Sequence, residues 1–184
     1  MTTLGWFGTL WLTRLSKPAG ERPLHRMVRR EAPRRILELG LGTLRRTERM
    51  LSLRRACGGD AVQYVGLDRF EGRLAGDPPG VTLKEAHRRL THLGRVQLVP
   101  GNVDASLARL CNHLGTFDLV LVAAENDPRH LERSWFFIQR LTTARTTVLV
   151  ETPIAGRTDR TTWKRLDKSR VDELAARTIQ RRAA

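Results

Sequence analysis

The 184-residue sequence predicts an α/β fold, a doubly wound, mainly parallel sheet of about five strands with helices on both faces. Three observations predict it. Short apolar runs alternate with helix-like segments, the runs are apolar throughout, and a Gly-x-Gly step follows the first run. Alternating strands and helices indicate right-handed βαβ crossovers and therefore a parallel sheet. Strands that helices cover on both faces read as continuous apolar runs.

Five segments have the strand pattern. Each is short, rich in leucine or β-branched residues, and bounded by glycine, proline or polar turn residues. These segments are residues 35–40, 62–68, 95–101, 117–124 and 146–152. After Thr152 the remaining chain reads as loop and helix, so no further strand is expected.

Helix-like segments connect and follow these strands. They are residues 43–57, 82–94, 105–115, 128–141 and 169–182. Thr82 followed by Glu85 is a capping box, which predicts a helix start. Asp104 is expected to cap the helix that follows the third strand. Asp127 before Pro128 is a good cap for the helix after the fourth strand.

The length is close to that of one domain, so a single core is expected. Residues 1–32 are predicted to be an N-terminal helical segment that packs on an α/β domain of residues 33–184. The apolar patch from Leu4 to Leu12 lacks a basic leader and a cleavage site, which argues against a signal peptide. It favours an aromatic-rich helix packed on the domain, and a membrane-surface or partner-binding segment is the alternative. No run approaches the roughly 20 apolar residues that span a bilayer.

The composition is strongly basic, with a net charge of +14 carried mostly by arginine. Such a charge attracts polyanions, so nucleic acid is a possible partner. The charge is spread along the chain, however, and a GC-rich genome would also favour arginine. Two cysteines, Cys57 and Cys111, form no metal cluster and fit a reducing cytoplasm. The histidines show no common ligand spacing, so no metal site is expected.

The first predicted strand ends in a Glu-Leu-Gly-Leu-Gly step within RRILELGLGT, residues 34–43. Ligands of doubly wound sheets bind beyond the carboxyl ends of the strands, beside the first strand. Gly40 and Gly42 would let the backbone turn sharply and approach a ligand closely. A dinucleotide site needs a third glycine, and Arg45 follows instead. Glu38 would repel a pyrophosphate but suits an ammonium group, which favours S-adenosylmethionine and leaves a nicotinamide cofactor as the weaker option.

The segment ILELGLGT resembles the first motif of class I S-adenosylmethionine-dependent methyltransferases, and the resemblance extends from about residue 33 to residue 152. Asp68 is similar to the second-motif acid, whose carboxylate accepts hydrogen bonds from the ribose hydroxyls. PGNVDASL resembles the third motif, which implies that Asn102 and Val103 flank the adenine. FDLVLVAAEND resembles the fourth-strand motif, which borders the methyl donor and acceptor. The resemblance implies a Rossmann-like methyltransferase fold.

The sequence also departs from the family pattern. Leu44 stands where a third glycine is common, and Ala123 and Ala124 stand where the fourth-strand motif often carries an acid. The family usually adds a sixth strand and an antiparallel seventh, which the sequence after Thr152 does not show. A sheet that lacks these last strands would lose one wall of the substrate pocket, which puts catalysis in doubt more than cofactor binding.

The hypothesis is therefore an S-adenosylmethionine-dependent methyltransferase of unknown acceptor. Its alternative is a catalytically inactive methyltransferase-like module that binds nucleic acid or another anionic partner through its arginines. The candidate catalytic residue is Glu125, which could orient an acceptor or take its proton. The candidate cofactor-binding residues are Glu38, Gly40, Gly42, Thr43, Asp68, Asn102 and Val103.

Overall fold

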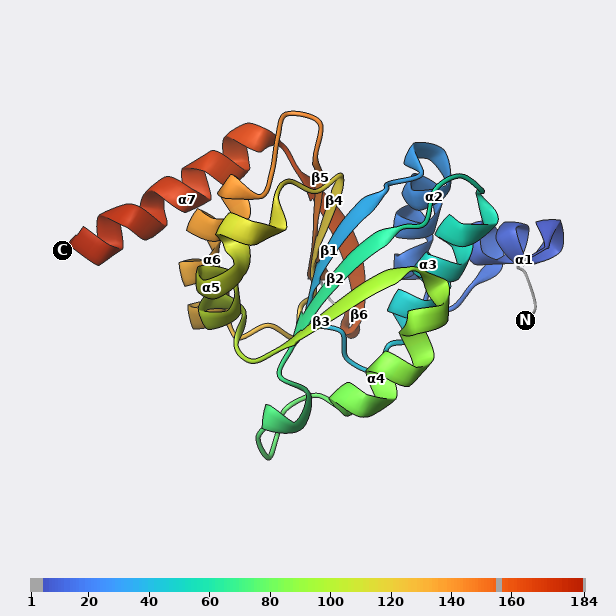
Figure 1. Ribbon diagram of the computed structural model, residues 1–184, viewed down its shortest axis with the longest axis horizontal. Coiled ribbons are helices and arrows are strands. Elements are labelled where there is room, and N and C mark those ends of the chain that lie inside the picture. Colours follow the sequence, from blue (N-terminus) through green and yellow to red (C-terminus); the bar gives the residue numbers. More distant parts are fainter. Residues whose placement is uncertain (1–4, 155–156, 184) are drawn as a thin grey trace.

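The computed structural model describes residues 5–154 and 157–183. A six-stranded sheet in the order β3-β2-β1-β4-β5-β6 forms the middle layer, with helices on both faces (Figure 1). The five strands β1 to β5 pair in parallel, as the apolar runs predict. The doubly wound α/β fold predicted from the sequence is therefore confirmed.

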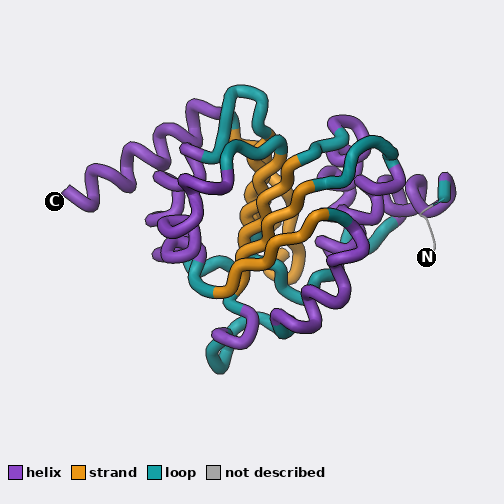
Figure 2. The backbone as a smooth tube through the Cα atoms, viewed as in Figure 1, coloured by secondary structure: helices purple, strands orange, loops and turns teal. Residues whose placement is uncertain are grey.

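The elements alternate along the chain, as Figure 2 shows by colour. The strands are β1 (Arg35–Leu39), β2 (Gln63–Asp68), β3 (Arg95–Pro100), β4 (Leu119–Val122), β5 (Thr147–Ile154) and β6 (Arg157–Leu166). The α-helices are α1 (Trp6–Leu10), α2 (Arg22–Glu31), α3 (Arg45–Ala56), α4 (Leu83–Leu90), α5 (Val103–Leu114), α6 (Pro128–Arg140) and α7 (Lys168–Ala183). Shorter helical turns are η1 (Trp11–Leu15), η2 (Ala19–Glu21), η3 (Phe70–Gly72) and η4 (Thr91–Leu93).

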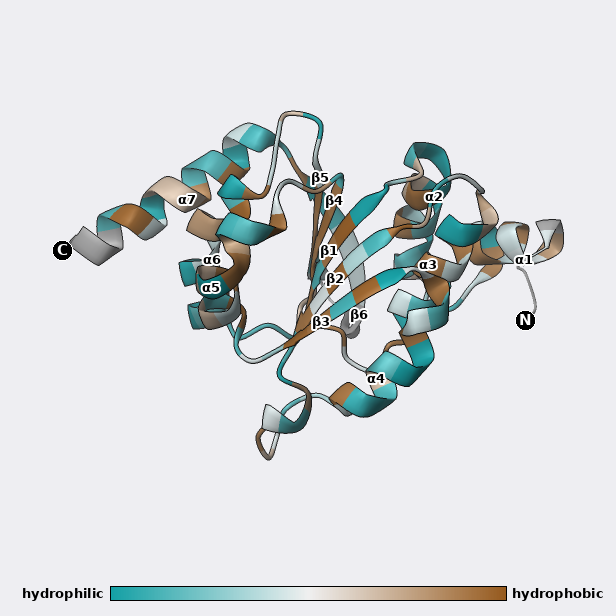
Figure 3. Cartoon of the chain, viewed as in Figure 1, coloured by the Kyte–Doolittle hydropathy of each residue, from teal (hydrophilic) through white to brown (hydrophobic). Residues whose placement is uncertain are grey.

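The sheet separates two apolar clusters. Ile36 of β1 packs into the cluster beneath α2, α3 and α4, whereas its neighbour Leu37 packs into the cluster beneath α5, α6 and α7. Leu121 and Val122 of β4 divide in the same way between the two faces. Since successive side chains point to opposite faces, a strand between two helical layers must be apolar at every position. Figure 3 shows this concentration of hydrophobic residues in β1 and β4.

The sheet has one strand more than the sequence predicts. Strand β6 pairs antiparallel with β5, and Trp163 on β6 is buried in the cluster beneath α2 and α3. The expectation that the chain after Thr152 forms only loop and helix is therefore wrong. The sequence of β6 gives no strand signal because it is polar and charged rather than apolar. Its position at the sheet edge, where pairing with β5 satisfies its backbone, explains why such a sequence forms a strand.

Two of the predicted helix caps are confirmed and one is wrong. The Thr82 side chain accepts a hydrogen bond from the Glu85 amide, and Asp127 accepts one from the Arg129 amide. Helix α5 begins at Val103, one residue before its predicted cap, so Asp104 lies in the first helical turn.

The N-terminal segment packs on the sheet through α2. Leu24 and Val28 of this helix are fully buried in the same cluster as Ile36, and Leu12 of η1 joins them. Within residues 5–154 and 157–183, no helix is both long and apolar enough to cross a membrane. The described part of the chain also contains no group of three or more acidic, histidine or cysteine side chains placed to hold a metal ion.

His25 of α2 makes the stability of this packing depend on pH. Its ring is 0% exposed, with Nδ1 3.1 Å from the Leu12 carbonyl oxygen, while Nε2 has no hydrogen-bond partner among the described residues. Burial lowers the pKa of His25 from 6.5 to about 4, although the Leu12 carbonyl partly opposes the shift. Because the unfolded chain binds the proton more tightly, we expect stability to fall by about 3 kcal/mol as the pH decreases from 6.5 to 4.

Urea unfolding across this pH range measures the effect. His25→Gln keeps a donor for the Leu12 carbonyl but does not titrate, so its stability should change less steeply with pH. His87→Gln, at an exposed position, should keep the wild-type slope. Equal slopes for wild type and His25→Gln would show that His25 does not carry the effect.

Candidate functional site

The predicted site lies where the carboxyl ends of β1, β2 and β4 meet. The glycine step leaves β1 with Gly40 at φ 84° and Gly42 at φ 55°, a backbone region that favours glycine. Asp68, at the end of β2, accepts hydrogen bonds from the backbone amides of Leu41 at 2.7 Å and Gly42 at 3.3 Å. The two predicted motifs are thus in direct contact, and the carboxylate of Asp68 fixes the shape of the glycine loop.

Leu44 occupies the position where the family pattern has a third glycine. It has φ 66° and ψ −7°, directly before α3, and its side chain is 0% exposed. The loop therefore keeps a left-handed residue at this position, at a cost of roughly 1–2 kcal/mol for a side chain with a Cβ. The buried leucine side chain offsets this cost, since deleting such a side chain loses roughly 2–5 kcal/mol.

Substitutions at Leu44 should reverse the usual order of alanine and glycine. We expect Leu44→Gly to be more stable than Leu44→Ala by about 1 kcal/mol, because both lose the side chain but only glycine relieves the left-handed backbone. The control is Leu51, which is also fully buried and lies inside α3. There alanine should be the more stable by about 1 kcal/mol. Urea unfolding of the four variants checks the order, and alanine proving the better residue at both positions would refute the backbone argument.

Glu38 lies within the protein and does not line the cleft. Its carboxylate is 0% exposed and accepts hydrogen bonds from Arg46 Nε at 2.8 Å, Thr47 Oγ1 at 2.9 Å and the Tyr64 hydroxyl at 2.7 Å. Arg46 in turn donates from Nη2 to the Gly40 carbonyl oxygen at 2.7 Å. Glu38 therefore acts on the glycine loop through Arg46, which differs from the direct ligand contact that its position in the motif suggests.

Arg46 also connects this loop to β5 and β6 at one edge of the sheet. It is 3.4 Å from Glu151 of β5, and its guanidinium lies 5.2 Å from the ring centre of Trp163 on β6. Glu151 accepts further hydrogen bonds from the Ala124 amide and from the Thr161 hydroxyl. Strand β6, absent from the sequence prediction, thus supplies two of the groups that hold the site together.

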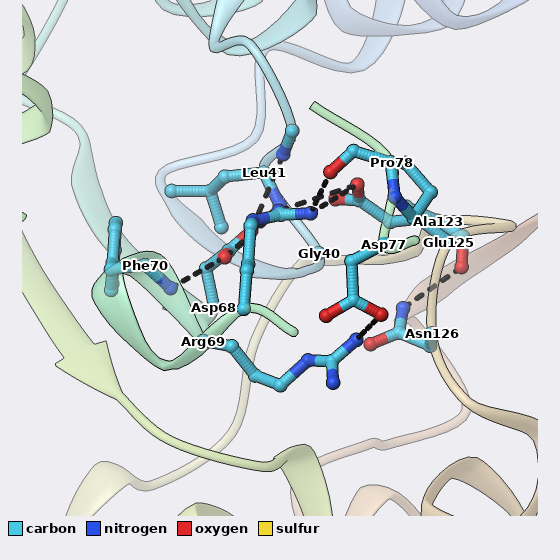
Figure 4. Close-up of polar contacts among 12 residues, drawn as sticks. Gly40, Leu41, Asp68, Arg69, Phe70, Asp77, Pro78, Ala123, Glu125 and Asn126 are labelled. Carbon is cyan, nitrogen blue, oxygen red and sulfur yellow. Dashed lines mark hydrogen bonds and ion pairs between the residues drawn. The ribbon is translucent and has the colours of Figure 1, made fainter. Parts of the chain in front are cut away.

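Arg73, in the loop after η3, lies between the two carboxylates that border the cleft. Its Nη2 is 2.9 and 2.7 Å from the two oxygens of Asp68, and Nη1 and Nη2 are both 3.3 Å from Glu125 Oε2. Figure 4 shows Asp68 and Glu125 at this cleft, together with the hydrogen bond from the Phe70 amide to Asp68. The guanidinium therefore covers the edge of Asp68 at which the resemblance would place ribose hydroxyls.

Glu125 lies directly over the glycine loop. A Cβ added to Gly40 would come within 3.0 Å of the Glu125 side chain and of the Asn126 amide nitrogen. Burial raises the pKa of Glu125, the nearby Arg73 lowers it, and Asp68 adds to the increase. Its Oε1 is buried without a hydrogen-bond partner among the described residues. The close approach that glycine permits is thus made by Glu125, a carboxylate with an unused acceptor.

The remaining predicted residues lie around the same cleft or at its rim. Asn102 precedes α5 without a side-chain cap, and Asn102 and Val103 line the cleft. Thr43 is exposed in the turn before α3. The cleft has a volume of only about 30 Å³, enough for a water molecule or two. Sites for larger organic ligands enclose roughly 300–1,000 Å³, so the cleft as it stands is too small to enclose a nucleoside-sized ligand, and the Arg73 side chain lies across it between Asp68 and Glu125.

Sequence reasoning missed two features of this cleft. Arg73 sits in a segment that shows only turn signals, although a cation is expected wherever two acids meet at one sheet edge. His130, in the first turn of α6, also lines the cleft and has Nδ1 2.9 Å from Asp104 Oδ1. Metal-ligand spacing among the histidines gives no signal for a single histidine that pairs with an acid.

The site carries an excess of negative charge. The carboxylates of Glu38, Asp68, Glu125 and Glu151 surround the guanidinium groups of Arg46 and Arg73. These six residues carry two more negative than positive charges, in a chain whose net charge is +14. Among the residues that line the cleft itself, the carboxylates of Asp68, Glu125 and Asp127 outnumber the guanidinium groups of Arg69 and Arg73 by one. A cluster of this sign favours a ligand that carries positive charge.

The fold built by these elements is the class I, Rossmann-like fold of S-adenosylmethionine-dependent methyltransferases, shown by its similarity to solved structures. TomG, an O-methyltransferase of Streptomyces achromogenes involved in tomaymycin synthesis, was solved in complex with S-adenosylmethionine. Its sequence is 20% identical to this chain, and the match covers 91% of this chain and 69% of TomG with a TM-score of 0.57. An O-methyltransferase of Bacillus cereus in complex with S-adenosylhomocysteine is 18% identical, with 76% and 58% covered and a TM-score of 0.56.

No protein-family model matches the sequence, and no curated protein is similar to it. The chain spans less than two thirds of the length of the Bacillus enzyme. At these identities the similarity shows the fold.

Proposed function

We propose that the protein is an S-adenosylmethionine-dependent methyltransferase. The observation that carries this proposal is the excess of carboxylates at the ends of β1, β2, β4 and β5, next to a glycine loop in this fold. A sulfonium cofactor with an ammonium group brings positive charge to that position. Its methyl group, when the cofactor is bound, is already electrophilic, so the protein's task is mainly to position donor and acceptor.

The roles of the predicted residues follow from their contacts. Gly40, Gly42 and Thr43 shape the loop that faces the amino-acid end of the cofactor, and Asp68 accepts hydrogen bonds from its ribose after Arg73 has moved away. Asn102 and Val103, at the start of α5, border the adenine. Glu38 is a positioning residue, since it holds Arg46 and through it the Gly40 carbonyl.

Glu125 is the proposed residue next to the methyl acceptor. Its buried and unpaired Oε1 is placed to accept a hydrogen bond from an acceptor hydroxyl or amine. Its raised pKa makes it a better proton acceptor than an ordinary surface glutamate. A general base is needed only if the acceptor has to lose a proton on methylation.

Calorimetric titration with S-adenosylmethionine tests the proposal. We expect saturable micromolar binding that Asp68→Asn weakens by about tenfold or more, which corresponds to a loss of roughly 1.4 kcal/mol. Asp60→Asn is the matched control, because Asp60 is exposed near the start of β2 and pairs only with Arg34 among the described residues. Thermal unfolding confirms that both variants are folded. Absence of saturable binding to wild-type protein and to a variant without Arg73 would overturn the proposal.

The second candidate is a methyltransferase-like module that binds nucleic acid without catalysis. Two observations favour it: the small cleft that Arg73 occupies and the 33 basic residues of the chain. Binding to nucleic acid would weaken steeply with salt, because each neutralised phosphate releases counterions. Salt-dependent RNA binding would favour the module if neither the wild-type protein nor the variant without Arg73 binds S-adenosylmethionine.

A further inference from the structure

Phe7, Trp11 and Leu15 form an exposed row of large apolar side chains on the N-terminal helical segment. Their exposed fractions are 79%, 46% and 62%. Among the described residues only two other large apolar side chains are exposed, Leu74 and Ile179, and they lie on separate elements. This exposed apolar row is therefore a local concentration and not the scatter of single apolar residues that is normal on protein surfaces.

The row follows from the helical geometry of the segment. Its members are four residues apart along α1 and η1, a spacing that places side chains on one side of a helix. The other side of η1 faces the protein, since Leu12 and Thr13 are buried. The segment thus has an apolar side that packs on the domain and a second apolar side that faces outward.

Hydrogen bonds hold this segment in place on the domain. His25 contacts the Leu12 carbonyl oxygen, and Arg22 donates from Nε to the Ser16 carbonyl oxygen at 2.9 Å. Arg22 Nη2 also contacts the Leu15 carbonyl oxygen. The outward direction of the apolar row is therefore fixed by contacts to α2. Figure 1 places α1 at the end of the molecule opposite the C-terminal end of α7.

Positive charge borders the apolar row. Arg49 lies 5.4 Å from the ring centre of Trp11 and also donates to the Lys17 carbonyl oxygen, as Arg45 does. Arg14, inside η1, and Lys17 are exposed. The acid that approaches this border is Glu21, which is 3.4 Å from Arg49.

We propose that this surface binds an anionic phospholipid bilayer. Helices that lie in the membrane interface combine aromatic and aliphatic side chains on one side with arginine and lysine beside them. Each basic residue near an anionic surface adds about 1 kcal/mol, and the apolar side chains enter the boundary between headgroups and acyl chains. The proposal is independent of the proposed methyl transfer.

The charges and side chains argue against two other occupants. A second copy of the chain in a symmetric contact would bring the basic border against itself, which is repulsive. RNA-binding surfaces stack successive bases on exposed aromatic faces, but the row has only two aromatic rings, Phe7 and Trp11, and the guanidinium of Arg49 lies against the Trp11 ring. Leu15, the last member of the row, offers a base no aromatic face. An anionic bilayer is complementary to both the apolar row and its border.

Sedimentation with phospholipid vesicles tests the proposal on the full chain. We expect binding to vesicles of equimolar phosphatidylcholine and phosphatidylglycerol, and much weaker binding to phosphatidylcholine alone. The variant with Phe7, Trp11 and Leu15 all changed to serine should partition at least about tenfold more weakly. The matched control changes Leu74 and Ile179 to serine, which removes exposed apolar side chains elsewhere and should leave binding unchanged. Thermal unfolding checks that both variants are folded.

Three results would overturn the proposal. Wild-type protein that stays in solution with anionic vesicles refutes it directly. Equal binding by the triple-serine variant would show that net charge alone drives the association. Loss of self-association or of RNA binding in that variant, with no vesicle binding by the wild type, would assign the row to a second copy or to RNA.

Discussion

Replacing Arg73 with alanine is expected to tighten the binding of S-adenosylmethionine by about tenfold or more. In the structure the guanidinium of Arg73 contacts both oxygens of Asp68 and one oxygen of Glu125. Cofactor binding must first break these contacts, so the apparent affinity is reduced by the rarity of the open state. Alanine removes that cost and leaves two carboxylates without a cation. Asp68 keeps its amide donors from Leu41 and Phe70, so the loop retains its shape.

Calorimetry on three proteins measures this effect. Arg69→Ala is the matched control, because Arg69 also lines the cleft but pairs with Asp77 at 2.8 Å. Arg69→Ala makes the same change in charge but leaves Arg73 on Asp68, so the affinity of this variant for S-adenosylmethionine should stay near that of wild type. An Arg73→Ala variant that binds no better than wild type would show that Arg73 is not an obstacle. A weaker affinity would assign Arg73 to the binding site itself.

Replacing Arg46 with methionine is expected to reduce the free energy of unfolding by about 3–5 kcal/mol, the largest stability effect in the site. Arg46 lies between Glu38, which is 0% exposed, and Glu151. Methionine keeps most of the buried volume but leaves the Glu38 carboxylate without its cation, and removing one partner of a buried pair is strongly destabilising. The Gly40 carbonyl also loses its donor.

A second substitution separates charge from packing. Adding Glu38→Gln to Arg46→Met removes the uncompensated carboxylate, so the double variant should be more stable than Arg46→Met alone. Arg45→Met is the control at an exposed neighbouring position and should change stability by roughly 0.5 kcal/mol or less. Urea unfolding gives the free energy of unfolding of the wild type, the two single variants and the double variant. A double variant no more stable than Arg46→Met would show that the cost is lost packing.

The parallel part of the fold was predictable because its signal is local. A strand covered on both faces, such as β4, must be apolar throughout, and its sequence shows this without reference to any other segment. Strand β6 carries no such signal. Its stability depends on pairing with β5, which directly precedes it, and on the burial of Trp163 against Arg46, which is distant in the sequence.

The same distinction applies to the candidate site. The glycine step and Asp68 were identifiable because their positions at strand ends follow from the strand pattern. The orientation of Glu38 was not, since it depends on Tyr64 and Arg46, which lie 26 and 8 residues away. Arg73 meets Glu125 across 52 residues. Long side chains on loops reach partners that no local pattern specifies.

A crystal structure grown with S-adenosylhomocysteine tests the central claim most directly. The account predicts the ribose hydroxyls within hydrogen-bond distance of Asp68, the adenine beside Val103, and the Arg73 guanidinium displaced from the cleft. A structure in which Arg73 still joins Asp68 to Glu125, with the ligand absent or bound elsewhere, would contradict it.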